Sequence, residues 1–227
     1  MTLDLFESTL TGVTEPIGPR AYILRGFALP YVERVLAELD EVRAAAPLRH
    51  LVTPSGHTMS VAMTNCGKLG WVSDEAGYRY SARDPLTQRP WPPLPPGMLA
   101  LARAAAAECG FADYDPDACL INQYVPGSRL TLHQDRNERD LEAPIVSVSL
   151  GLPATFQFGG LKRTDPVQRM GLWHGDVALW GGVDRMRFHG ISTLKDGWHA
   201  QLGRQRLNFT FRVVLDKTRR IQAQEAE

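Results

Sequence analysis

The chain has few cysteines and no net charge, and each absence argues against a class of protein. Its 227 residues include three cysteines, Cys66, Cys109 and Cys119, and none lies at Cys-x-x-Cys spacing. This odd, scattered set argues against a disulfide framework or a zinc ribbon and fits a reducing compartment. The 25 basic residues balance the 25 acidic residues. Bulk charge therefore does not predict strong non-specific binding to long DNA.

The chain also lacks a long apolar run at its start, where Met-Thr-Leu-Asp-Leu-Phe-Glu is acidic. We therefore expect no signal peptide, no membrane span and a cytoplasmic location. A hydrophobic content of 44% and a charged content of 22% are ordinary for a soluble globular protein. A chain of this length is sufficient for one sizeable domain with its own core.

The N-terminal half contains two helical patterns. Residues 30–46 begin with a proline, carry apolar residues at helical spacing and are followed by the helix breaker Pro47. An Ala-rich segment predicts a second helix over 96–109. We expect an irregular arm over 1–20, and short strands and loops over 51–95, where Gly, Pro, Ser, Thr and aromatic residues are frequent.

From Cys119 onward the pattern changes to short strand-like segments separated by turn signals. Several short strands at this spacing predict a sandwich or barrel. The expected strands are 119–124, 129–134, 145–150, 154–158, 168–173, 177–180, 187–192 and 206–214. The chain is therefore predicted to be mixed α+β.

The strand Arg-Leu-Asn-Phe-Thr-Phe-Arg at 206–212 is unusually polar on one side. Alternate side chains share a face, and this face carries Arg206, Asn208, Thr210 and Arg212. Two arginines on a buried face are costly unless an anion binds them. A carboxylate ligand would satisfy them through paired hydrogen bonds. In the alternative interpretation, the arginines pair with acids such as Asp176 or Asp184 at the rim.

A second group of residues predicts a metal site. His133 and Asp135 are two positions apart and can share a face, and His189 completes two histidines and one carboxylate. This set is typical of a facial Fe(II) triad, which leaves coordination positions open for a cosubstrate and dioxygen. A His-x-Asp pair also occurs by chance, so an ordinary structural pair and a zinc site remain alternatives.

Donors for a keto-acid cosubstrate lie on the 119–124 segment, where Asn122 and Tyr124 share a face. Arg206 could bind the far carboxylate. A metal site beside an anion site suggests an Fe(II) oxygenase with a keto-acid cosubstrate. The stretch 71–89 interleaves aromatic and basic residues, which suits bases and phosphates, although a solvated loop with core aromatics is the plainer alternative.

These residues lie in motifs that resemble the AlkB family of Fe(II)/2-oxoglutarate dioxygenases. The matching segments are 59–67, 116–122, 132–135, 143–153, 156–163, 174–176, 188–190 and 206–212. The resemblance implies a double-stranded β-helix (jelly-roll) core with N-terminal helices and a nucleotide-recognition lid. We expect one globular unit, with the N-terminal extension, helices and lid over 1–115, the catalytic core over 116–214 and a polar tail over 215–227.

The resemblance also assigns roles, position by position. It implies iron ligation by His133, Asp135 and His189. It implies 2-oxoglutarate contacts from Asn122, Tyr124, Arg206, Asn208 and Arg212. It implies a methylated base between Trp71 and His133, with further substrate contacts from Tyr78, Arg163, Met63 and Leu120.

Asn137 departs from the bacterial repair proteins of this family, which have an acidic residue at the matching position close to the base. Asparagine lacks the negative charge that would favour a cationic methylated base, but it both accepts and donates hydrogen bonds. We expect weaker discrimination in favour of cationic lesions and a wider tolerance of bases.

The implied reaction is oxidative demethylation of N-alkylated bases, such as 1-methyladenine and 3-methylcytosine, in single-stranded DNA or RNA. It would use Fe(II), 2-oxoglutarate and O2 and release formaldehyde and succinate. Single-stranded substrate avoids the energy of unpairing a base. The alternatives are a 2-oxoglutarate-dependent hydroxylase of a protein or small molecule and a non-catalytic single-strand-binding module. We expect a monomer.

Overall fold

The computed structural model describes residues 11–215, so the predicted tail beyond residue 215 lies outside the described residues. The strands of the described part are β1 (Thr14–Gly18), β2 (Ala21–Leu24), β3 (Arg49–Val52), β4 (Thr58–Gly67), β5 (Gly70–Asp74), β6 (Gly77–Ser81), β7 (Ala118–Tyr124), β8 (Leu130–His133), β9 (Ile145–Gly151), β10 (Ala154–Phe158), β11 (Gln168–Leu172), β12 (Val177–Trp180), β13 (His189–Ile191) and β14 (Arg206–Arg212). The helices are α1 (Val32–Ala45) and α2 (Pro96–Glu108), with short 3-10 turns η1 (Leu29–Tyr31) and η2 (Gly182–Asp184).

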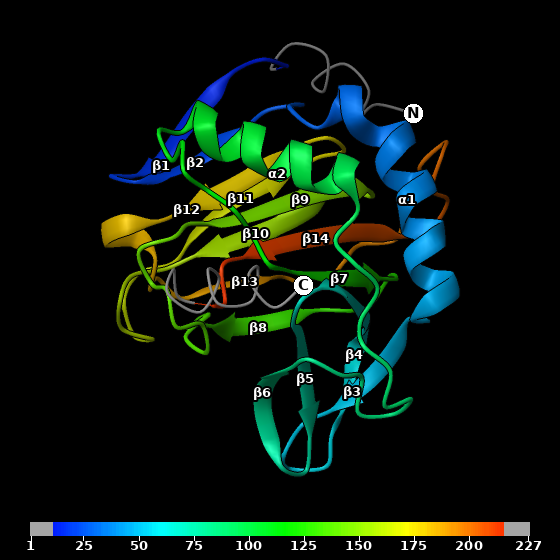
Figure 1. Ribbon diagram of the computed structural model, residues 1–227. Helices are drawn as coiled ribbons and strands as arrows, with labels where there is room; N and C mark the ends of the chain where they lie inside the picture. The colour runs from blue at the N-terminus through cyan, green and yellow to red at the C-terminus, as the bar shows by residue number, and fades with distance from the viewer. Residues whose placement is uncertain (1–10, 216–227) are drawn as a thin grey trace.

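Two antiparallel sheets form the body of the protein (Figure 1). The larger sheet has eight strands in the order β1-β2-β12-β9-β14-β7-β4-β3, and the smaller has the order β11-β10-β13-β8. Strands β5 and β6 form a separate two-stranded hairpin, which extends from one end of the molecule near β3 and β4 (Figure 1). The strand β14 is central in the large sheet and pairs with β7 on one side and β9 on the other.

Two apolar clusters lie on opposite faces of the large sheet. On the outer face, the apolar residues of α1 and α2 pack against alternate residues of β14, including Phe209 and Phe211. Both helices lie across this face (Figure 1). Between the two sheets lies a second cluster that includes Leu120, Phe156 and Trp180. Burial of apolar surface in both clusters is the main stabilising contribution, at roughly 25 cal/mol per Å² removed from water.

The structure agrees with the sequence-based elements in most places. The predicted helices at 30–46 and 96–109 correspond to η1 with α1 and to α2. Each of the eight strands expected after residue 118 is present, with ends that differ by at most a few residues. Loops and strands alternate over 51–95 as expected, although β4 is longer than the short strands predicted there.

The predicted irregular arm is wrong in part, because β1 is a strand at the edge of the large sheet. Its sequence Thr-Glu-Pro-Ile-Gly has no clear alternation and contains proline, which usually argues against a strand. An edge strand tolerates proline because one side of its backbone has no pairing partner. Pairing with β2 and burial of Ile17 hold β1 in place, and neither contact is visible in the local pattern.

None of the helices within residues 11–215 has the length and apolar character needed to cross a membrane.

The N-terminus of α2 is capped by a residue of α1, which suggests a test of the helix pair. Pro95 provides no side-chain cap. Instead, the buried Glu38 carboxylate accepts hydrogen bonds from the backbone N–H groups of Gly97 (2.7 Å) and Met98 (2.8 Å). We expect Glu38→Ala to lower the free energy of unfolding by about 1–2 kcal/mol, because it leaves these donors without their acceptor. Chemical denaturation would measure the change, with Glu41→Ala on the exposed side of α1 as the control. Equal stability of the two variants would contradict this capping role.

Candidate active site

A cavity of about 790 Å³ lies between the two sheets and reaches the β5–β6 hairpin. Every residue predicted to be a metal ligand, a cosubstrate contact or a nucleotide contact lines this cavity. These residues come from segments that are far apart in the chain, so the fold brings together groups that the sequence separates.

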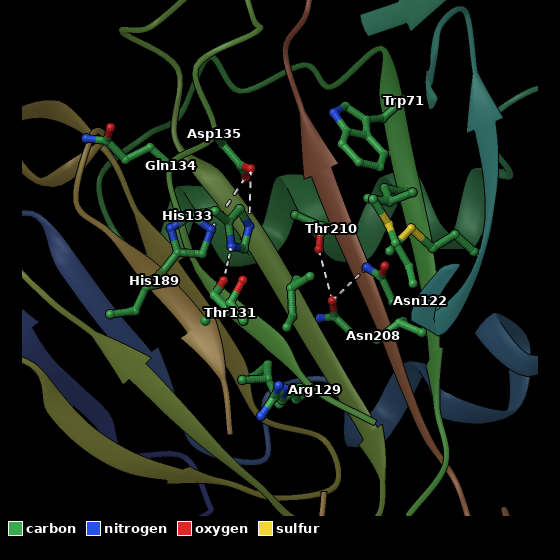
Figure 2. Close-up of a pocket in the computed structure, with 18 of the residues that line it drawn as sticks. Trp71, Asn122, Arg129, Thr131, His133, Gln134, Asp135, His189, Asn208 and Thr210 are labelled. Atoms are coloured by element: carbon green, nitrogen blue, oxygen red, sulfur yellow. Dashed lines mark hydrogen bonds and ion pairs between the residues drawn. The ribbon is translucent and has the colours of Figure 1, made fainter. Parts of the chain in front are cut away.

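The three candidate metal ligands converge at one end of the cavity (Figure 2). His133 on β8 and His189 on β13 are direct partners across the antiparallel pair, and their ring centroids are 4.4 Å apart. Asp135 follows β8, with its carboxylate oxygens 3.7 Å from Nε2 of His133 and 3.8 Å from Nε2 of His189. One ligand atom from each residue lies within 4.8 Å of the other two.

Backbone carbonyls orient both imidazole rings toward this point. Nδ1 of His133 lies 2.9 Å from the carbonyl oxygen of Thr131, and Nδ1 of His189 lies 3.1 Å from that of Arg187. A carbonyl only accepts hydrogen bonds, so each Nδ1 carries the proton and each Nε2 is free to bind a metal. Burial and the neighbouring His133 lower the pKa of His189 to about 3, which keeps this ligand neutral at physiological pH.

Asp135 is held by the buried side chain of Arg212, the last residue of β14. Nε and Nη2 of Arg212 donate to the same carboxylate oxygen, Oδ2, at 2.9 and 2.8 Å. Burial raises the pKa of Asp135, but Arg212 and the two histidines outweigh it and hold that pKa below its usual range. The carboxylate is therefore ionised and offers Oδ1 to a cation. Two neutral imidazoles and one carboxylate oxygen are a donor set that fits Fe(II).

Arg206, at the other end of β14, lies in the cavity without an acidic partner. Its Nη2 donates to Oγ of Ser149 at 2.8 Å, whereas Nε and Nη1 are buried and have no hydrogen-bond partner among the described residues. The residue is 1% exposed. Burial lowers its pKa, and the adjacent Tyr124 opposes that shift. A buried guanidinium with unused donors requires an anion, so the site fits a carboxylate of 2-oxoglutarate.

Pairing of the arginines with rim acids is therefore ruled out. Asp176 binds Arg25 at 2.7 Å, and Asp184 binds Arg187 at the same distance. Neither of these acids forms an ion pair with Arg206 or Arg212 within residues 11–215.

Strand register places further polar groups beside Arg206. In the β14–β7 pair, Arg206 is opposite Tyr124 and Asn208 is opposite Asn122. Nδ2 of Asn122 donates to Oδ1 of Asn208 at 3.2 Å, as Figure 2 shows. Oδ1 of Asn122 is buried without a partner in the described chain. This row forms the polar floor of the cavity.

Two serines that the sequence patterns did not single out support this floor. Ser149 accepts from Arg206, and Ser147 accepts from Nδ2 of Asn208 at 2.8 Å. Both lie on β9, whose sequence is Ile-Val-Ser-Val-Ser-Leu-Gly. Two serines at alternate positions of an otherwise apolar strand were a usable signal, because they share the face that meets β14.

Sequence patterns also missed two buried charges behind Asp135. Nη1 of Arg185 donates to the backbone carbonyl of Asp135 at 2.6 Å, and Nη2 donates to Glu138 at 3.1 Å. Both residues lie in irregular segments, where periodicity gives no information.

The β5–β6 hairpin forms the opposite wall of the cavity. Trp71 stacks on Tyr78, with ring centroids 5.6 Å apart and an interplanar angle of 15°. The side chain of Asn65 fixes the backbone of Trp71 through two hydrogen bonds, each of 3.0 Å. In Figure 2, Trp71 lies across the pocket from the two histidines. An aromatic surface thus faces the candidate metal site.

Sequence comparisons agree with this geometry. A family model described as 2OG-Fe(II) oxygenase superfamily matches residues 20–212. The alpha-ketoglutarate-dependent dioxygenase AlkB of Salmonella typhimurium is 53% identical over 215 residues, which cover 95% of this chain and 99% of that protein. The chain belongs to the AlkB family. The protein of the same name in Escherichia coli is 54% identical over 92% of this chain and 97% of its own length. The solved structure of OsALKBH1 superposes with a TM-score of 0.76 at 25% identity, covering 88% of this chain and all of that one.

This AlkB-family protein is an Fe(II)-dependent and 2-oxoglutarate-dependent dioxygenase, 2-oxoglutarate being another name for alpha-ketoglutarate. The predicted family, double-stranded β-helix fold, enzyme class and cofactors are thereby confirmed. The triad His133, Asp135 and His189 is present with ligand geometry. The other residue assignments stay predictions, for which the geometry gives tests.

Replacement of Arg206 tests the anion site. We expect Arg206→Lys to weaken 2-oxoglutarate binding at least tenfold, because a lysine cannot make the paired hydrogen bonds of a guanidinium. Calorimetric titration of the Mn(II)-loaded protein with 2-oxoglutarate would measure the loss. Arg204→Lys is the matched control, since Arg204 lies two positions away and pairs with Asp196 at the surface. Equal affinities in both variants would refute an anchoring role for Arg206.

Proposed function

We propose that this dioxygenase removes N-methyl groups from bases such as 1-methyladenine and 3-methylcytosine in single-stranded DNA or RNA. The observation that carries the proposal is the aromatic surface of Trp71 across the cavity from the metal triad. Homology to AlkB supports a methylated nucleic acid as the substrate class. A monomer in the cytoplasm remains our expectation for its state and location.

The substrate pocket suits a base that has left its stack. Trp71 and His133 both line the cavity. Trp71 would stack on one side of the base, and His133 would lie on the other side. Base–aromatic stacking contributes roughly 1–3 kcal/mol per base, comparable to the energy of unstacking one. Met63 and Leu120 give the cavity an apolar wall near the candidate base position. A duplex would add the energy of unpairing, so single strands should be favoured.

The rim of the pocket carries groups that suit a phosphate backbone. Tyr78 is 48% exposed at the hairpin, where its hydroxyl can donate to a phosphate. Arg163 lies over the ring of Phe188, with its guanidinium carbon 5.1 Å from the ring centroid. This cation–π contact holds the guanidinium at the rim, and Arg163 is exposed, so its N–H donors are accessible to a phosphate.

The remaining roles are binding of the cosubstrate, at the polar floor of the cavity, and binding of the metal, at the triad. Arg206, Asn208, Asn122 and Tyr124 would bind and orient the cosubstrate, while Arg212 holds Asp135. Bound Fe(II), 2-oxoglutarate and O2 supply the oxidation, in which one oxygen atom converts 2-oxoglutarate to succinate and carbon dioxide and the other leaves with the methyl carbon as formaldehyde. The chain's part is to place the methyl group at the triad and to exclude water from the reacting groups.

Mass spectrometry of a defined oligonucleotide tests this function directly. A single strand carrying one 1-methyladenine is incubated with the protein, Fe(II), 2-oxoglutarate and ascorbate. We expect the loss of one methyl group, only with cosubstrate, and no loss with His133→Ala, because two ligands hold the metal too weakly. An unchanged oligonucleotide with continued succinate formation would show that the protein is an active oxygenase and that 1-methyladenine in a single strand is not its substrate. Tight oligonucleotide binding without succinate would favour a binding module.

Substitution of Asn137 tests lesion preference. Asn137 is exposed and lines the cavity, so a change there should not disturb the core. We expect Asn137→Asp to raise kcat/KM for cationic 1-methyladenine relative to a neutral lesion such as 1-methylguanine by about three- to tenfold, since a carboxylate attracts the cation. Competition between two oligonucleotides in one reaction would give the ratio. Asn137→Ser is the control for the lost amide, and an unchanged ratio in Asn137→Asp would show that this position does not set the preference.

A further inference from the structure

The hairpin that carries Trp71 is connected to the metal carboxylate by a buried polar network. Tyr80 lies on β6 directly opposite Trp71 on β5. Whereas Tyr78 is exposed at the tip, the hydroxyl of Tyr80 points inward and donates to Oε1 of Glu138 at 2.6 Å. Burial raises the pKa of Tyr80 well above its ordinary value, so the hydroxyl is a neutral donor. Beyond the backbone contacts of Asn65, Tyr80 gives the hairpin an anchor in the body of the protein.

Glu138 is the centre of this network. Its side chain is 2% exposed and accepts from Tyr80 on one oxygen and from Arg185 on the other. Nε of Arg212 lies 3.4 Å from Oε1, the same oxygen that Tyr80 contacts. Arg185 and Arg212 in turn hold Asp135, one through its backbone carbonyl and the other through its carboxylate. Four buried charges, two negative and two positive, therefore form one neutral cluster behind the metal site.

Arg212 is placed between two competing carboxylates. Its Nε is 2.9 Å from Oδ2 of Asp135 and 3.4 Å from Oε1 of Glu138. The Tyr80 hydroxyl donates a short hydrogen bond to Oε1 of Glu138, so this oxygen attracts Nε of Arg212 less strongly. Without that hydroxyl, Oε1 would be a buried acceptor with one fewer donor, and Nε of Arg212, 3.4 Å away, is a donor that could replace it. The hold on Asp135 would then weaken.

We propose that Tyr80 and Glu138 are positioning residues that couple the nucleotide-binding hairpin to the orientation of the metal ligand Asp135. Neither residue touches the metal, and they act through Arg212 and Arg185. Stacking of Trp71 on a base would hold Tyr80 in place. Tyr80 would then hold Glu138, and through Arg212 and Arg185 the carboxylate of Asp135. Because coupling free energies are reciprocal, metal binding would also order the hairpin for its substrate. The nucleotide part of this proposal rests on the proposed function, whereas the metal part does not.

Metal affinity without substrate provides the first test. The full-length, metal-free protein is titrated with Co(II), and its visible absorption reports binding. We expect Glu138→Gln to weaken binding about tenfold or more, because it leaves a net positive charge beside a cation site and disturbs the support of a ligand. We expect Tyr80→Phe to weaken it about threefold or more, although it removes only one distant hydroxyl.

Tyr114→Phe is the matched control. The hydroxyl of Tyr114 is also buried, but it has no hydrogen-bond partner within the described chain, and Tyr114 does not line the cavity. This variant should bind Co(II) as the parent protein does. Thermal unfolding of all three variants shows whether a loss of affinity comes from a folded protein. If Tyr80→Phe does not fold, Glu138→Gln still tests the central residue, because it retains an acceptor for Tyr80.

A second test measures how tightly the conversion of 2-oxoglutarate to succinate is coupled to the removal of the methyl group as formaldehyde. In the demethylation assay, the ratio of succinate to formaldehyde reports turnover without productive placement of the methyl group. We expect Tyr80→Phe to raise this ratio at saturating oligonucleotide, whereas a general loss of stability would lower both products together. The ratio in Tyr114→Phe should match the parent protein.

Co(II) affinity in Tyr80→Phe equal to that of Tyr114→Phe would overturn the coupling. Weakened Co(II) binding with an unchanged succinate-to-formaldehyde ratio would overturn the part that concerns the nucleotide. If no variant or parent protein demethylates the oligonucleotide, the proposed function fails, but the Co(II) titration still decides whether Tyr80 supports Asp135.

Discussion

The active site depends on one buried ion pair, between Arg212 at the end of β14 and Asp135 after β8. Removing two charges from water is expensive, and their attraction offsets this only with good geometry and further hydrogen bonds. Here both guanidinium bonds go to one oxygen of Asp135, which leaves the other oxygen for the metal. Arg212 is also a strand residue, so the metal carboxylate has a fixed position only when β14 is correctly paired within the large sheet.

The strand β14 therefore joins folding to catalysis. Its outward residues Leu207, Phe209 and Phe211 belong to the core beneath the two helices. Its inward residues include Asn208, whose amide is hydrogen-bonded, and Arg206, whose Nε and Nη1 are buried without a partner among the described residues. Apolar burial on one face stabilises a strand whose other face is costly to bury. This cost comes mainly from the unpaired donors of Arg206, and a dianionic cosubstrate that accepted their hydrogen bonds would remove it.

The parts of the site that could be predicted from the sequence are those with local signals. Alternation exposed the polar face of β14, and spacing related His133 to Asp135, because strand geometry imposes both. His189 completed the donor set of the triad by its residue type, and the family resemblance then assigned the hairpin residues Trp71 and Tyr78 to the nucleotide. Tyr80, Glu138 and Arg185 gave no such signal, since their roles arise from contacts between irregular or distant segments. The strand β1 was missed for the same reason, as only its pairing with β2 makes it a strand.

The two ends of the cavity differ in how strongly the fold constrains them. At the end with Arg206 and Asn208, where we expect the cosubstrate to bind, polar residues are buried and tied to strand register, so we expect a substitution there to change both folding and binding. At the end with the β5–β6 hairpin, where we propose that the nucleotide binds, Asn137 and Tyr78 are exposed and their side chains support little of the core. We therefore expect that substitutions at these exposed positions can change substrate preference while the chemistry at the triad stays the same. The network through Tyr80 is an exception to this separation, because it connects the β5–β6 hairpin to the metal triad through buried residues.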